Sequence, residues 1–484
     1  MPPVKLAIVG GGPSAFYVAS RLLSRLPQSE SLRVHMFDRL WAPHGLVRYG
    51  VAPDHPEVKN CTHKFDTVAN DPRFRFFGNV NVGSTPLSSI PHALSIPLPS
   101  ILNNYTHLLY ATGCTLPTLH PAIPPSAYCI PALSLVHWYT QHPAHSPPPP
   151  LEKMTHVTLI GNGNVSLDIA RILLTSPSIL AKYDVPQPVL ETLSRSAVKH
   201  VSIVARRGPL EAAFTMKELR EMINLPEASM VPIEPGLLAP SPDIILTRQQ
   251  KRALDLLQKG SKNLPGSTSK TWSLDFFRSP TGLTPPPLSS LDTQAQLTLA
   301  HNYLDPATNR AVPTGETSSL STSLVITSLG FHTDPETSFF DPSVNHLRSL
   351  AGRVVSPVGS VLKHVYASGW AANGAKGVLA TTMMDAHAVA DTIISDITSN
   401  GEVLENRVMQ TSPATPTSSE IVFNPHPHPD DPPLEIQQGI KDGAVVQYND
   451  WKAIDDEEIR RGEAMGKERE RMVWEEARRF LARV

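Results

Sequence analysis

Cysteine is scarce in this chain of 484 residues, and its three cysteines, Cys61, Cys114 and Cys129, lie far apart. None of them belongs to a Cys-x-x-Cys pair, which argues against the dithiol relay of disulfide reductases. Three thiols also fall short of the four thiolates that usually hold an iron–sulfur cluster. We therefore expect structural thiols, and no residue pattern in the sequence predicts a metal site.

An excess of one charge is also missing, as are long apolar runs. The 42 Lys and Arg residues nearly balance the 44 Asp and Glu residues, which leaves a net charge of −2. This balance offers no global electrostatic attraction for nucleic acid. No stretch of about 18 apolar residues is present, so no segment is predicted to span a bilayer, while peripheral membrane association stays open. The length allows two or three domains with large cores.

What the sequence does contain is a glycine turn near its start. The run GGGPSA, residues 10–15, directly follows apolar residues 4–9 and precedes apolar positions at helical spacing. A strand, a glycine turn and a helix in this order are typical of a dinucleotide site. Gly10 and Gly12 would let the backbone approach a pyrophosphate, whose charge the helix N-terminus favours. Asp38 ends the next apolar segment, where its carboxylate can accept hydrogen bonds from ribose hydroxyls.

A second glycine turn, GNGNVS, occupies residues 161–166, after the apolar segment 156–160. The next apolar segment, 201–205, is followed by Arg206 and Arg207 instead of an acid. Two guanidinium groups can hold a 2′-phosphate through charge-assisted hydrogen bonds, whereas a carboxylate would repel it. The second turn therefore predicts NADP(H), and the first predicts a nucleotide with a free ribose 2′-hydroxyl, namely FAD.

The order of these segments predicts the fold class. We expect an α/β protein with two Rossmann-like dinucleotide-binding domains, in which the NADP domain is inserted into the FAD domain. Residues 1–115 and 331–484 would form the FAD domain with a C-terminal extension, and residues 116–330 would form the NADP domain.

Two further segments are interpreted from their composition. The proline-rich segment 143–150 lies just before the second glycine turn and is predicted to be a semi-rigid interdomain linker. Residues 455–480 are rich in charge with helical spacing, which favours a solvated helix.

Five runs, taken in order, carry a family resemblance: GGGPSAFY, GLVRYGVAPDHPEVKN, GNGNVSLDIARILL, RRGPLEAAFTMKELREM and SGWAANGAKGVLATTMMDA. They resemble adrenodoxin reductase, the family of mitochondrial NADPH–ferredoxin oxidoreductases, over nearly the whole chain. The runs at 45–60 and 206–222 are specific to this group. The resemblance implies electron transfer from NADPH through FAD to an acidic [2Fe–2S] ferredoxin, in a monomeric protein of the mitochondrial matrix. The first apolar strand starts at about Val4, which leaves no visible presequence in this chain.

The resemblance also implies site residues. For FAD, besides Gly10 and Gly12, they are Ser14, Asp38, Leu46, Val82, Trp370, Gly377, Val378 and Leu379. For NADP they are Asn162, Gly163, Asn164, Val165, Arg206, Arg207, Glu218 and Gly377. A ferredoxin would dock on Arg220, Arg248 and Arg252, of which the last two stand four apart on one helix face. Hydride transfer needs no general base, so His55 and Asp168 are supporting candidates only.

The sequence departs from the family pattern at three places. Ala15 stands where the family usually has Gly, and Asp38 replaces a longer Glu. Residues 370–377, WAANGAKG, stand where the family typically has a Lys or Arg pair and Gly-Pro-Thr. Two alternatives therefore stay open: a flavin- and NADPH-dependent monooxygenase, and a family member with impaired turnover. The downstream pathway is not encoded in any motif.

Overall fold

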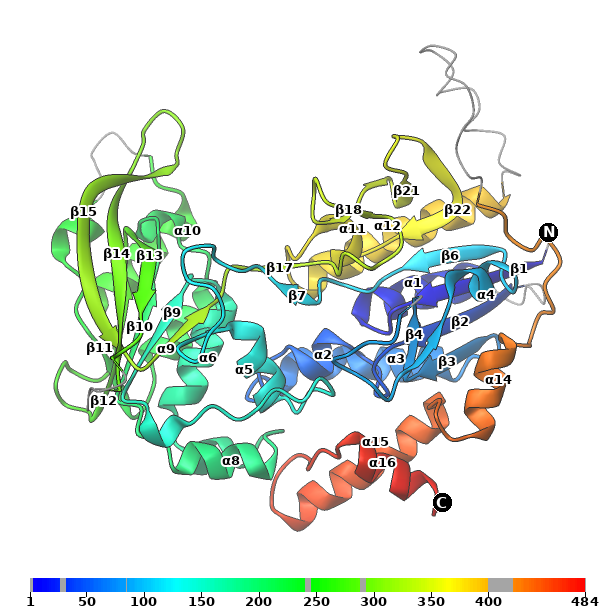
Figure 1. The fold of residues 1–484 in the computed structure, drawn as a ribbon, viewed down its shortest axis with the longest axis horizontal. Helices are drawn as coiled ribbons and strands as arrows, with labels where there is room; N and C mark the ends of the chain where they lie inside the picture. Colours follow the sequence, from blue (N-terminus) through cyan, green and yellow to red (C-terminus); the bar gives the residue numbers. More distant parts are fainter. Residues whose placement is uncertain are drawn as a thin grey trace.

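The computed structural model describes residues 3–26, 32–83, 85–239, 245–287, 293–398 and 421–483. Two α/β bodies lie side by side in it, each built around a largely parallel sheet (Figure 1). No helix among the described residues is long and apolar enough to cross a membrane.

The first sheet has seven strands and combines both ends of the chain. Its order is β20 (Ser349–Leu350), β21 (Arg353–Val355), β22 (Val361–Ala367), β6 (His107–Tyr110), β1 (Val4–Val9), β2 (Leu32–Asp38) and β3 (Phe74–Gly78). The strands from β22 to β3 run parallel. All six residues of β1 are buried, as expected where both faces of a parallel sheet are covered. Helices α1 (Pro13–Arg25) and α12 (Leu379–Thr398) pack against each other on this sheet.

The second sheet has six parallel strands from the middle of the chain. Its order is β11 (Ala228–Met230), β12 (Lys270–Asp275), β10 (His200–Val204), β9 (His156–Ile160), β16 (Leu324–Thr327) and β8 (Cys129–Pro131). Its helices include α5 (Ala132–Tyr139), α6 (Asn164–Leu174), α7 (Pro177–Leu180), α8 (Gln187–Ser194), α9 (Met216–Ile223) and α10 (Arg248–Lys259). The antiparallel strands β13 (Arg278–Thr284), β14 (Ala295–Leu304) and β15 (Ala311–Thr322) lie at its outer side (Figure 1).

The remaining elements are short. They are α2 (Leu46–Tyr49), η1 (Pro56–Cys61), α3 (Thr62–Ala69), β4 (Val80–Val82), β5 (Leu94–Ile96), α4 (Leu98–Leu102), η2 (Leu151–Lys153), η3 (Pro209–Glu211), η4 (Pro235–Leu238), β18 (Phe340–Asp341), β19 (His346–Leu347) and α11 (Trp370–Asn373).

Two short strands connect the bodies. β7 (Leu116–Pro117) and β17 (Phe331–His332) pair antiparallel between the two sheets (Figure 1). The predicted linker role of residues 143–150 is wrong, because the chain has already joined the second sheet at β8 before it reaches them. The predicted domain boundaries fall beside the β7–β17 pair, and they stay a prediction.

The C-terminal region also differs from the sequence-based expectation of one solvated helix. It forms α14 (Leu434–Lys441), α15 (Tyr448–Ala464) and α16 (Trp474–Leu481), which run below the first body in Figure 1 and reach toward α8 of the second. Trp451, Met472 and Trp474 belong to the core of the first body. Glu458 is completely buried and Arg471 is 2 % exposed. These two charges are buried because they pair with other parts of the chain, which a helical charge pattern does not reveal.

Candidate functional site

The two glycine turns have matching backbone geometry. Gly10 and Gly161 have φ values of 107° and 112°, in the region that favours glycine. A Cβ atom would overlap the Ala111 carbonyl oxygen at the first position and the Ser328 carbonyl oxygen at the second. Each of these glycines therefore lies so close to the end of a neighbouring strand that a residue with a Cβ atom would not fit.

Helices α1 and α6 begin at these turns with free N-termini. Their N-cap residues, Gly12 and Gly163, provide no side-chain cap. A Cβ atom at either glycine would meet no atom within 4 Å, so both positions face open space. The first-turn N–H groups of a helix lack partners within the helix and carry partial positive charge. Both turns thus fit a phosphate group.

A large cavity opens at the first turn. It contains about 1110 Å³ of space free of protein atoms, including its open mouth. Its lining includes every residue that the resemblance assigns to FAD except Val82: Gly10, Gly12, Ser14, Asp38, Leu46, Trp370, Gly377, Val378 and Leu379. The structure therefore brings these residues together, and their contact with FAD stays a prediction.

Val82 lines a second, smaller cavity that adjoins the first. Both cavities share Gly10, Asp38 and Thr112 in their linings. The Thr112 hydroxyl is buried and has no hydrogen-bond partner within the described part of the chain. The Tyr49 hydroxyl, in the lining of the first cavity, is also without a partner there. Buried polar atoms are nearly always hydrogen-bonded, so these two fit a polar ligand.

Asp38 fixes the first turn from the end of β2. Its Oδ2 accepts a hydrogen bond from the Gly11 N–H at 3.0 Å, and its Oδ1 accepts one from the Leu40 N–H at 3.0 Å. Burial raises the pKa of Asp38 to about 6. Each carboxylate oxygen keeps a second lone pair, so the predicted acceptance of ribose hydroxyls is compatible with these bonds.

Residues 370–377, which depart from the family pattern, form a hydrogen bond within the segment. The Trp370 indole N–H donates to the Lys376 carbonyl oxygen at 3.0 Å. Asp385 accepts from the Gly369 N–H at 2.7 Å, which fixes the start of α11. Val378 is 55 % exposed and Leu46 is 38 % exposed, so the rim of the first cavity presents apolar groups to solvent.

The residues predicted for NADP fall into two groups. The first group lies at the start of α6 and consists of Asn162, Gly163, Asn164 and Val165. The second group follows β10, where Arg206 is exposed and Arg207 is half-buried. The Asn164 side-chain oxygen accepts from the Thr215 N–H at 2.8 Å, which holds the start of α9 near the turn. Glu218 differs, because it is 8 % exposed and accepts a hydrogen bond from Arg171 Nη1 at 3.1 Å.

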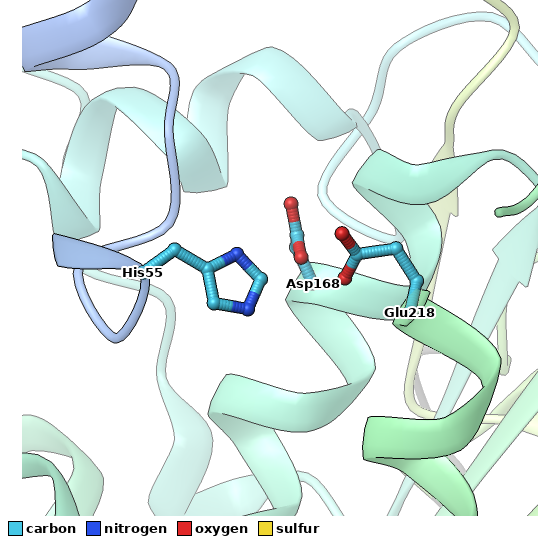
Figure 2. Close-up of side chains that lie close together, drawn as sticks. All are labelled: His55, Asp168 and Glu218. Carbon is cyan, nitrogen blue, oxygen red and sulfur yellow. The ribbon is translucent and has the colours of Figure 1, made fainter. Parts of the chain in front are cut away.

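His55, Asp168 and Glu218 come together from three segments (Figure 2). Their side-chain nitrogen and oxygen atoms lie within 4.8 Å of one another. Arg171 stands among these groups, with two hydrogen bonds to Asp54 of 2.6 and 3.0 Å and one to Asp168 of 2.9 Å. Arg171 thus supplies the positive charge that a metal ion would otherwise bring to these carboxylates.

Sequence reasoning missed two members of this ionic cluster, Arg171 and Glu221. Glu221 Oε2 lies 2.8 Å from His55 Nε2 and 3.1 Å from Arg171 Nη1. A signal existed for Arg171, because it follows Asp168 by three residues on a helix and so shares its face. Glu221 carries no such signal for this cluster, since its partners here, His55 and Arg171, lie on other segments.

The cluster contains more acids than bases, and this decides where a proton resides. Burial raises the pKa of Asp168 to about 7, against the opposing charge of Arg171 and with the help of Glu218 and Asp54. At Asp54, burial is outweighed by the hydrogen bonds and charge of Arg171, which hold its pKa below the usual range. Asp168 is therefore the carboxyl group of this cluster that can hold and release a proton near neutral pH.

The three arginines predicted for docking are all exposed. Arg220 lies on α9, and Arg248 and Arg252 lie on α10. A capping box between Thr247 and Gln250 starts α10. Ala253, Leu254 and Leu257 form the buried face of this helix, so the arginines point to solvent.

Comparisons with known proteins agree with this geometry. A family model described as FAD-NAD(P)-binding matches residues 7–58. Human "NADPH:adrenodoxin oxidoreductase, mitochondrial" is 34 % identical to this chain, with 97 % of the chain and 90 % of the relative covered. "NADPH-ferredoxin reductase FprA" of Mycobacterium tuberculosis is 34 % identical over 82 % of the chain and 85 % of the relative.

The solved structure of Mycobacterium tuberculosis FprA in complex with NADPH has the same fold, with a TM-score of 0.79 and 30 % identity. The similarity covers 99 % of this chain and 100 % of that one. This chain therefore matches these reductases almost from end to end. It also contains two glycine turns that begin uncapped helices, with an acid after the first turn and an arginine pair after the second. The chain belongs to the NADPH:adrenodoxin oxidoreductase family of FAD- and NADP(H)-dependent oxidoreductases.

Proposed function

We propose that this oxidoreductase passes electrons from NADPH through FAD to a [2Fe–2S] ferredoxin. The observation that carries the proposal is the pair of matching glycine turns with different charges after them, Asp38 at one and Arg206–Arg207 at the other. FAD is assigned to the first turn and the two adjoining cavities, and NADP(H) is assigned to the second turn. The family to which the chain belongs supports the same direction of electron flow.

The residues of the chain bind and orient the two nucleotides. FAD, when bound, supplies the hydride acceptor and the one-electron donor. The free N-termini of α1 and α6 attract the phosphates, and Arg206 and Arg207 hold the 2′-phosphate. Leu46 and Val378 at the rim of the first cavity would help to keep water from the reacting ring when the nucleotides are bound. Asp168, whose pKa burial raises to about 7, is the proposed proton-holding group beside His55.

The proposed partner docks on the basic surface formed by Arg220, Arg248 and Arg252. The test is a double variant, Arg248→Gln with Arg252→Gln, assayed with a [2Fe–2S] ferredoxin. Both side chains are exposed, so we expect the fold and the ferredoxin-independent reduction of ferricyanide to be unchanged. The KM for ferredoxin should rise about 10-fold or more at low salt, and the salt dependence should become shallower.

A control variant is Lys363→Gln, a substitution of an exposed lysine on β22 in the other body. It should leave the KM for ferredoxin unchanged. An unchanged KM in the double variant would contradict docking on α10, and substrate-stimulated oxygen uptake would favour the monooxygenase alternative.

We also propose a location and an assembly state. Several relatives carry "mitochondrial" in their names, while a similarly close relative is bacterial, so the mitochondrial matrix is the proposed compartment. Residues 1–115 with 331–484 and residues 116–330 are proposed as the two domains of a monomer. Fractionation of cells that express the natural gene tests the compartment, and sedimentation tests the monomer and any membrane association.

A further inference from the structure

The end of strand β2 carries an arginine that no motif drew attention to. Arg39 follows Asp38 and lines both the first and the second cavity. The other residues common to the two linings are Gly10, Asp38, Thr112 and Thr115. Arg39 therefore stands where the two cavities meet, next to the first glycine turn.

The backbone on both sides of Arg39 is held in place. Asp38 accepts hydrogen bonds from the Gly11 and Leu40 N–H groups, each at 3.0 Å. The Leu40 carbonyl oxygen accepts from the Asn79 N–H at 3.0 Å. The Arg39 side chain is therefore attached at a well-defined position at the junction of the two cavities.

The charge of Arg39 is poorly compensated within the described part of the chain. Its side chain is 28 % exposed, and the nearest carboxylate oxygen, Asp334 Oδ2, lies 4.0 Å from Nη1. Its guanidinium forms no hydrogen bond with any described residue. Arg73 and Arg353 of the same body, in contrast, each have two hydrogen bonds to a carboxylate, that of Asp71 and that of Asp396.

Asp38, Asp334 and Glu336 line the second cavity together with Arg39, but none of them forms a hydrogen bond with its guanidinium. His137 and His142, which also line the first cavity, stack with ring centroids 3.7 Å apart. Burial and the charge of Arg39 lower the pKa of His137 to about 4, so this imidazole is neutral at physiological pH. Burial also lowers the pKa of Arg39 itself, against the charges of Asp38 and Asp334. A largely buried guanidinium without a hydrogen-bonded anion is costly, and phosphate oxygens are its best-matched partner.

We propose that Arg39 is a positioning residue that donates hydrogen bonds to the diphosphate of the dinucleotide bound at the first turn. A diphosphate carries two negative charges, and the N-terminus of one helix offers only about half a positive charge. Arg39 adds one further positive charge at the junction of the two cavities. This inference rests on the proposed binding of FAD to the first cavity, and it adds a contact that the sequence motifs do not contain.

The experiment measures ligand binding to apoprotein from which FAD has been removed. FAD, ADP and adenosine are each titrated calorimetrically into wild type, Arg39→Gln and Arg39→Lys. Arg39→Gln should weaken FAD and ADP by about 10- to 100-fold and leave adenosine unchanged, because only the first two carry the diphosphate. Arg39→Lys should keep part of the affinity. Arg25→Gln, at an exposed arginine that ends α1, is the matched control and should bind all three ligands like wild type.

Thermal unfolding of the same apoproteins separates this role from a structural one. Without ligand, Arg39→Gln should melt no earlier than wild type, because it removes a poorly compensated charge. With FAD, it should gain less stability than wild type does. Asp334→Asn should leave ADP binding at least as tight as in wild type.

Three results would overturn the inference. The first is that Arg39→Gln binds FAD and ADP as tightly as wild type. The second is that Arg39→Gln loses as much affinity for adenosine as for ADP. The third is that Asp334→Asn weakens ADP binding as much as Arg39→Gln does. A wild-type apoprotein that binds neither FAD nor ADP would instead contradict the proposed function, and this inference would fall with it.

Discussion

At the scale of single residues, the ionic cluster around Arg171 and the arginine pair after β10 differ in how their charges are compensated. Asp168 shares Arg171 with Asp54, Glu218 and Glu221, so one cation faces several acids in a buried cluster. Arg206 and the half-buried Arg207 show the opposite case, because they follow β10 with no ion pair to a described residue. The excess of acids lets the cluster hold a proton, and the arginine pair is free to bind an anion.

Asp168 should make stability depend on pH. Its pKa is raised from 3.8 to about 7 in the folded protein, so folding favours its protonated form. This contribution is fully present below about pH 4 and is lost as the pH rises through 7. The melting temperature of Asp168→Asn relative to wild type should therefore increase from pH 5 to pH 8. A difference that is constant or falls over this range would show that Asp168 is ionised throughout.

Arg206 and Arg207 should decide between NADPH and NADH. Replacing both by Gln removes charge-assisted hydrogen bonds to the 2′-phosphate, which NADH lacks. The KM for NADPH should rise about 10- to 100-fold, while the kinetic constants for NADH stay within about twofold of wild type. Steady-state reduction of ferricyanide with each nucleotide measures this, and an equal loss with both nucleotides would contradict the assignment.

At the scale of elements, the two glycine turns and the C-terminal helices play different parts. The first turn places the free N-terminus of α1 at the first cavity and the second turn leaves the N-terminus of α6 uncapped, whereas the segment between α15 and α16 joins the two bodies. Arg471 forms two hydrogen bonds to Asp184, of 2.5 and 2.8 Å, and donates others to the Thr140 and Arg48 carbonyl oxygens. This arginine thus contacts both the first body and the helices of the second.

Removing Arg471 should destabilise the protein strongly. Arg471→Met leaves a buried carboxylate at Asp184 with Lys59 as its one remaining cationic partner among the described residues, and a loss of about 3–5 kcal/mol is expected. The double variant with Asp184→Asn should recover part of this loss. Arg478→Met, at an exposed position on α16, is the control and should change stability by less than about 0.5 kcal/mol. Urea unfolding measures all three, and a silent Arg471→Met would contradict the joining role.

The elements also show what the sequence could and could not predict. Strands β1 and β9 run over the residues expected, Val4–Val9 and His156–Ile160, because apolar runs next to glycine turns are strong local signals. The C-terminal segment was misjudged, since Glu458 and Arg471 are buried by partners far away in the sequence. Arg39 carried no signal either, because its lack of a partner appears only once the cavities are formed.

At the scale of the whole molecule, the two glycine turns lie in two bodies that are joined by a narrow connection. The paired strands β7 and β17 and the C-terminal segment are the links between the bodies that Figure 1 shows. The first cavity takes lining residues from both bodies, since Leu133 and His137 of α5 line it together with Gly10 and Trp370. Under the proposed assignment, this shared cavity is where NADPH would reach FAD, with each nucleotide bound at its own turn.

The most direct measurement is NADPH-driven reduction of cytochrome c by the FAD-loaded protein, with and without a mitochondrial-type [2Fe–2S] ferredoxin. If the protein transfers electrons from NADPH through FAD to ferredoxin, the rate should be low without ferredoxin and should increase with ferredoxin until it saturates. Added salt should reduce the ferredoxin-dependent part, because docking on α10 is electrostatic. A rate that ferredoxin does not change would contradict the proposed function.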